Sequence, residues 1–131
     1  MIDVANICEV LGKLAEAEQF TNETIEIAER IDNDALLAHG YMRVSANAWA
    51  RGDYGLHRQA LNQSLELAQA TRQFFVEANA FCGLGNNDAI HNMQDDALMH
   101  YSQALLIARA NGFRQLENML VSNVGVIHQL H

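Results

Sequence analysis

The sequence predicts an all-α fold in which antiparallel helix pairs form an array, and three observations support this prediction. The chain is similar to itself at a shift of forty residues, where Ala28 coincides with Ala68 and Ala108. Its apolar residues follow helical spacing, and no convincing run of strict alternation indicates a strand. Its 131 residues include no proline to interrupt a helix. A fixed period of this size is typical of units that bury their apolar faces against their neighbours.

The same forty-residue register aligns apolar residues at other positions. The aligned sets are Ile25 with Leu65 and Leu105, Ile27 with Leu67 and Ile107, Val4 with Val44, Leu84 and Val124, and Leu36 with Val76 and Leu116. Glycines coincide as well, because Gly12 falls on Gly52 and Gly85 falls on Gly125. We therefore expect one domain over residues 1–131, with units at about 2–31, 34–71 and 74–110 and a terminal helix at 114–130.

About seven helices are expected from the apolar spacing and the punctuation between the helices. Their expected ranges are 2–11, 14–31, 34–51, 54–71, 74–91, 95–110 and 114–130. Asp53 and Asp95 are suited to cap the helices that follow them, and Asn111-Gly112 provides a left-handed stop. Helices joined by such short turns must pack antiparallel.

Particular residues in the third unit match a known repeat. Phe81 and the Leu84-Gly85 pair lie in one predicted helix, and the series Ala97, Tyr101 and Ala104 lies in the next. This spacing is typical of the tetratricopeptide repeat, which has a Leu-Gly pair in one helix and an Ala, aromatic, Ala series in the following one. The chain resembles the tetratricopeptide repeat family over nearly its whole length. It departs from the family pattern at His57 and Leu61, where Ala and an aromatic are usual, and its period exceeds the common 34 residues.

The resemblance implies a right-handed superhelical array, an α-solenoid, whose first helix in each pair lines a concave groove. The long, forty-residue form is similar to repeat regions of bacterial signalling proteins and transcriptional regulators. It implies a protein- or peptide-binding scaffold that acts as a regulatory or sensory module.

Groove positions carried over from the family fall on the predicted first helices of the units. These positions are Asn6, Glu9, His39, Met42, Arg43, Trp49, Asn79, Cys82, Asn86, Ile90, Met119, Ser122 and Asn123. Asparagine amides both donate to and accept from a peptide backbone, and Trp49 is the expected hot spot. The alternative interpretation is that Trp49 packs between helices and that the asparagines bond one another.

Charge and motif content argue against several function classes. Eight basic and sixteen acidic residues give a net charge of −8, which disfavours nucleic acid and anionic membranes as partners. The start of the chain lacks the pattern of a secretory signal, and Cys8 and Cys82 have no metal or redox spacing, so a cytoplasmic location is expected. We expect no cofactor and no metal, and no enzyme activity, because no nucleophile or phosphate-binding motif is present.

The last predicted helix is apolar on most of its circumference, which indicates that something else covers it. Its residues Leu116, Leu120 and Ile127 are therefore expected to form an exposed apolar face. Either the chain belongs to a longer protein that covers this face, or two copies bury it against each other. The alternative function is thus a structural homodimerisation module that acts through its terminal helices.

Overall fold

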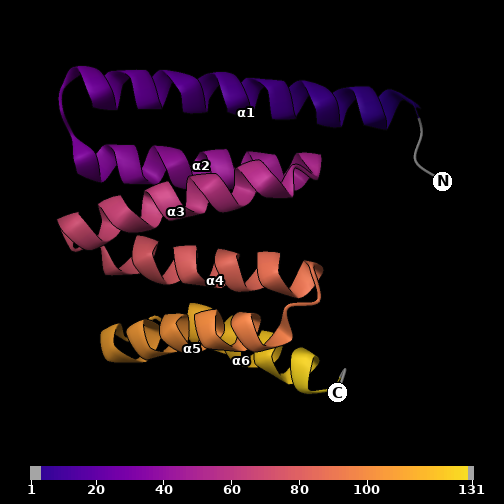
Figure 1. Cartoon of the computed structure of the whole chain (residues 1–131). Helices are drawn as coiled ribbons and strands as arrows, with labels where there is room; N and C mark the ends of the chain where they lie inside the picture. The colour runs from indigo at the N-terminus through magenta and orange to yellow at the C-terminus, as the bar shows by residue number, and fades with distance from the viewer. Residues whose placement is uncertain (1–3, 130–131) are drawn as a thin grey trace.

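A computed structural model describes residues 4–129 of the chain and the side chains of residues 12–127. Six helices and no strands are present in this range (Figure 1). The helices are α1 (Val4–Arg30), α2 (Asp34–Arg51), α3 (Tyr54–Thr71), α4 (Phe74–Ile90), α5 (Gln94–Asn111) and α6 (Arg114–Gln129). The prediction of an all-α fold is confirmed, and the expected bounds of the helices after residue 33 agree with the structure to within one residue.

The five turns between the helices share one backbone conformation. Each turn contains one residue with positive φ, and these residues, which stand twenty positions apart, are Asp32, Gly52, Arg72, Asn92 and Gly112. The residue that follows donates its N–H to the carbonyl five positions back, for example Asp53 to Ala48 and Met93 to Asp88, both at 2.9 Å. This bond belongs to the Schellman motif, which satisfies carbonyls that the helix end leaves free. The helices therefore end at regular intervals, and each reverses the direction of the one before it.

Side-chain caps strengthen two of the helix starts. The Asp53 carboxylate accepts the Leu56 N–H at 3.1 Å, as the sequence predicts, and the Asn33 side chain accepts the Leu36 N–H at 3.0 Å. The prediction for Asp95 is wrong, because Met93 occupies the N-cap of α5 and makes no side-chain cap. Asp95 lies within the first turn instead, where its negative charge interacts favourably with the helix dipole.

The prediction of two helices at 2–11 and 14–31 is also wrong, because α1 runs without a break from Val4 to Arg30. Gly12 coincides with Gly52 in the repeat register, but only Gly52 has a positive φ. A single glycine costs a helix only about 1 kcal/mol, so good helix formers on both sides continue it.

The helices form one stack in which each packs against the next along the chain (Figure 1). The most extensive contacts join α2 to α3 and α4 to α5. The even-numbered helices also touch one another, α2 with α4 and α4 with α6, whereas no comparable contact joins α1, α3 and α5 within the described chain. The even-numbered helices are thus closer together than the odd-numbered ones.

Glycines permit the close approach of several helices. A Cβ added at Gly85 would lie 2.5 Å from the Tyr101 ring, and one added at Gly83 would lie 2.8 Å from Leu61. Neither distance is compatible with a side chain in the present packing, so these two glycines set how closely α4 packs against α5 and α3.

The assignment of Leu116, Leu120 and Ile127 to an exposed face requires correction. All three side chains are buried, in the same core cluster as Tyr101, Ala104 and other residues of α4 and α5. The chain itself covers this side of α6, because α5 packs against it. The large apolar side chains of α6 that are exposed are Met119, Val121 and Val126.

None of the described helices has the length and apolarity needed to cross a membrane.

Two glycine substitutions test the turn assignments. We expect Gly12→Ala to raise the free energy of unfolding by about 0.5–1 kcal/mol, because Gly12 lies within a helix and its added Cβ meets no atom within 4 Å. Gly52→Ala should lower it by about 1–2 kcal/mol, because Gly52 has φ +78°. Urea denaturation of both variants measures the two effects, and a destabilised Gly12→Ala variant would contradict the continuous α1.

Candidate functional site

A hollow of about 290 Å³ lies over the side of the stack where α2, α4 and α6 approach one another. Its lining combines methionine, aromatic and amide side chains. The lining residues are Met42, Ser45, Ala46 and Trp49 of α2, His57 and Leu61 of α3, Asn79, Cys82, Gly83 and Asn86 of α4, and Met119 of α6. We call this site the α2–α4–α6 hollow.

The structure brings together about half of the predicted groove residues. Met42, Trp49, Asn79, Cys82, Asn86 and Met119 all line the hollow. His39, Arg43, Ile90, Ser122 and Asn123 do not line it. Asn6 and Glu9 lie outside the residues whose side chains the structure describes.

The residues outside the hollow have other surroundings. The Arg43 guanidinium lies 5.7 Å from the centre of the Phe20 ring of α1, a cation–π distance. Asn123 borders the site, because its amide nitrogen lies 3.5 Å from the Asn86 side-chain oxygen. His39, Ile90 and Ser122 are exposed.

Each of the two asparagines of α4 in the hollow has one side-chain group without a hydrogen-bond partner among the described residues. Asn79 donates through its amide nitrogen to the Phe75 carbonyl at 2.9 Å, which leaves its side-chain oxygen as an acceptor. The side-chain oxygen of Asn86 accepts from the Tyr101 hydroxyl at 2.5 Å, and its amide nitrogen makes no bond to the described residues. Since seven residues of helix span about 10 Å, the two groups match the length of about three residues of extended peptide.

Trp49 both packs within the protein and faces solvent. Its ring contacts Tyr54 edge-on at 5.2 Å and His57 at 4.8 Å between ring centres, and 37% of the residue remains exposed. These contacts hold the indole in place, which lowers the entropy that a ligand loses by binding to it. The interpretation that Trp49 packs between helices is therefore confirmed in part, and its role as a hot spot stays a prediction.

A buried polar network that the sequence analysis missed joins α3, α4 and α5. Asp88 of α4 is 1% exposed, and its carboxylate pairs with the Arg58 guanidinium of α3 and, at 2.5 Å, with Nδ1 of His100 of α5. A buried carboxylate is costly unless partners of this kind surround it. The pairing therefore ties three helices to one another in a single register.

Asn87 extends the network towards the hollow. Its side-chain oxygen accepts from Arg58 Nε at 3.1 Å, and its amide nitrogen donates to the Tyr54 carbonyl at 2.8 Å and to His57 Nδ1 at 3.0 Å. His57 accepts this bond only while Nδ1 lacks a proton. Burial, and secondarily the Arg58 charge, lower the pKa of His57 below 6.5. One feature of the sequence indicates that Asn87 and Asp88 are buried: they continue the helical spacing of the buried residues Val76, Ala80 and Leu84.

Burial also raises the pKa of two groups in this region. It raises the pKa of the Cys82 thiol to about 11, so the thiol is protonated at neutral pH and is a weak nucleophile. Burial, with smaller contributions from Cys82 and Asp88, raises the pKa of Tyr101 to about 12. Tyr101 therefore remains a hydrogen-bond donor to Asn86 at neutral pH.

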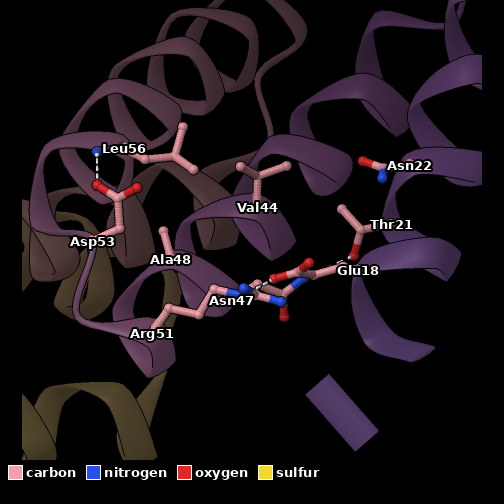
Figure 2. Close-up of a pocket in the computed structure, with 9 residues that line it drawn as sticks. All are labelled: Glu18, Thr21, Asn22, Val44, Asn47, Ala48, Arg51, Asp53 and Leu56. Carbon is pink, nitrogen blue, oxygen red and sulfur yellow. Dashed lines mark hydrogen bonds and ion pairs between the residues drawn. The ribbon is translucent and has the colours of Figure 1, made fainter. Parts of the chain in front are cut away.

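A second hollow, of about 340 Å³, lies between α1, α2 and the start of α3 (Figure 2). Arg51 pairs with Glu18 across it, and the Asn47 amide donates to the Thr21 hydroxyl at 3.3 Å. These polar groups thus bond one another across the helix interface. They hold α1 against α2, so part of their hydrogen-bonding capacity is already used within the protein.

Among the described residues, no group of three or more His, Cys, Asp or Glu side chains is arranged to hold a metal ion. Comparison with known proteins adds no assignment: no protein-family model matches the sequence, and no curated protein is significantly similar to it. The geometry of the hollow is therefore the basis on which we argue function.

The lowered pKa of His57 predicts that acid destabilises the fold. As the pH falls through 6.5, the unfolded chain takes up a proton on His57 that the folded chain does not, so the free energy of unfolding decreases. One such proton contributes a slope of at most about 1.4 kcal/mol per pH unit. We expect denaturation curves between pH 5 and pH 8 to show this loss, with a smaller slope for His57→Gln.

Glutamine keeps an acceptor for Asn87 but does not titrate, so the comparison isolates the ionisation of His57. His39→Gln, which removes an exposed histidine from α2, is the matched control. Equal slopes in the wild type and in His57→Gln would show that protonation of His57 is not linked to folding.

Proposed function

We propose that this chain is a tetratricopeptide-like scaffold that binds a segment of another protein, or a peptide, in the α2–α4–α6 hollow. The observation that carries the proposal is the common location of Met42, Trp49, Asn79, Asn86 and Met119. These residues come from three helices spaced along the chain, and all five are among the groove positions carried over from the tetratricopeptide repeat family. In this proposal, as the resemblance implies, the scaffold is the regulatory or sensory part of a bacterial signalling protein, and it acts in the cytoplasm, as expected from the start of the chain and its cysteines.

Two features support an α-solenoid architecture. Five turns of one conformation recur every twenty residues, so the chain repeats one helix-turn unit. The even-numbered helices contact one another and the odd-numbered helices do not, in the part of the chain that the structure describes. A stack that is tighter on one side curves towards that side, so α2, α4 and α6 would line the inner face, where the hollow lies.

The composition of the hollow favours an apolar anchor on an uncharged stretch of peptide. Met42 and Met119 are unbranched and adapt their shape to an inserted side chain. Trp49 provides a rigid aromatic surface, and Asn79 and Asn86 provide one acceptor and one donor for the peptide backbone. None of the lining residues is Lys, Arg, Asp or Glu, so recognition of a terminal carboxylate or a phosphate has no support there.

Selection from a random peptide display library against the purified chain tests the proposal. We expect selected peptides to share a large apolar residue and to lose about 30-fold or more in affinity for Trp49→Ala, the loss typical of a hot spot. Met119→Ala should weaken binding less, because its side chain is flexible. Isothermal titration with one selected peptide measures both effects.

Two control variants separate loss of contact from loss of fold. Trp49→Phe retains a ring against Tyr54 and His57 and should keep part of the affinity. Leu106→Ala removes an exposed apolar side chain of α5 that is not among the lining residues, and should bind as the wild type does. The proposal fails if the selected peptides bind Trp49→Ala and Met119→Ala as tightly as the wild type while both variants remain helical by circular dichroism.

A further inference from the structure

The exposed side of α6 corresponds to the surface that α4 uses to bind the helix after it. In α4, Phe81 stacks on His100 with ring centres 6.3 Å apart, and Gly85 lies directly against the Tyr101 ring. A shift of forty residues places Val121 and Gly125 at these positions in α6. Val121 is 49% exposed, and a Cβ added at Gly125 would meet no atom within 4 Å. The side of α6 formed by Val121 and Gly125 is thus exposed and has space for another helix to pack on it. We call this side the α6 end face.

At the other end of the stack, α1 exposes residues that its counterparts bury. Ala60 and Ser64 of α3 are buried, and the Ser64 hydroxyl donates to the Ala38 carbonyl of the preceding helix at 2.8 Å. Their counterparts in α1 are Phe20 and Thr24. Phe20 is 58% exposed even though Arg43 lies over its ring.

The exposed stripe continues along α1. Ile27 corresponds to Leu67, which packs against the core cluster of Ala38, Ala68 and Val76, yet Ile27 is exposed. Ile31, one turn further along, is exposed as well. We call Phe20, Thr24, Ile27 and Ile31 the α1 end face. It is a continuous helical stripe that in α3 packs against the preceding helix.

We propose that the α1 end face of one copy of the chain docks on the α6 end face of a second copy, so that the array continues from molecule to molecule. The contacts between α4 and α5 serve as the template for this interface. By that template, Val121 lies opposite Phe20 as Phe81 lies opposite His100. α1 lies at one end of the stack and α6, next to α5, at the other (Figure 1), so a copy docked on one does not block the other.

The shapes of the faces favour this occupant over a symmetric one. Two α6 end faces would place Gly125 and Val121 against the same small residues and leave a gap, and gaps in an interface lose contact energy. Two α1 end faces would place large side chains against large side chains. They would also bring together two negatively charged helices, because each α1 carries Glu16, Glu23, Glu26 and Glu29 and few basic residues. A large stripe on a small face resembles the contacts already made inside the chain.

The docking is heterologous, so each added copy presents a free α6 end face or a free α1 end face. The average mass in solution should therefore rise steadily with concentration above that of the 14.6 kDa chain, without a limit at the dimer. This inference rests on the proposed helical array but not on peptide binding in the hollow.

Multi-angle light scattering of the whole chain across a dilution series, with single charge substitutions, tests the proposal. Phe20→Glu and Val121→Glu should each keep the mass at that of a monomer at all concentrations. An equimolar mixture of the two variants has one intact α1 end face and one intact α6 end face, so it should form a dimer of twice the monomer mass and nothing larger. Recovery of dimer in the mixture also shows that both variants are folded.

Val126→Glu is the matched control for Val121→Glu. It introduces the same charge on the same helix at a valine that is 53% exposed, but its counterpart in α4 is Asn86, which faces the hollow. It should assemble as the wild type does, and so should Trp49→Ala, which keeps this test apart from that of peptide binding. A wild type that remains monomeric at millimolar concentration overturns the proposal. So does a mass that only one of Phe20→Glu and Val121→Glu reduces, because that outcome indicates a symmetric interface.

Discussion

The architecture depends on one backbone constraint, the left-handed residue that ends each helix. Asp32, Gly52, Arg72, Asn92 and Gly112 have positive φ, and the bond from the following residue closes each helix end in the same way. Because these residues recur every twenty positions, α2 to α6 have nearly equal lengths and their neighbours run antiparallel. With these lengths α4 lies against both α2 and α6, and the α2–α4–α6 hollow lies where they approach one another.

A second constraint holds the stack in register. Few large apolar side chains are fully buried in the described core. The polar residues Asn87 and Asp88 are among the largest side chains that are fully buried. Apolar packing between small residues tolerates sliding, whereas the bonds of Asp88 to Arg58 and His100 have one geometry. The network therefore specifies how α3, α4 and α5 align. It also positions His57 at the wall of the hollow, where the Tyr101 hydroxyl separately holds the side chain of Asn86.

Local features were predictable from the sequence, and features that depend on several helices were not. The bounds of α2 to α6 follow from turn residues and apolar spacing, which act within a few positions. Gly12 misled the prediction because a glycine ends a helix only when it adopts a positive φ, and Gly12 keeps a helical backbone. The apolar circumference of α6 showed that the helix is covered, but not which side α5 covers, so Leu116, Leu120 and Ile127 were placed outside. The partners of Asp88 come from two other helices, and no local pattern relates them.

The geometry of α6 explains how one helix could serve binding and assembly at once. Successive residues are rotated by about 100°, so Met119, Leu120 and Val121 face three directions. Met119 lines the hollow, Leu120 is buried in the core with α5, and Val121 lies on the α6 end face. A second copy docked on Val121 would leave Met119 accessible and would place its own inner helices next in line. Assembly would then lengthen the binding surface without occupying it, and several weak sites in a row would bind a long or repeated partner more tightly than one site does.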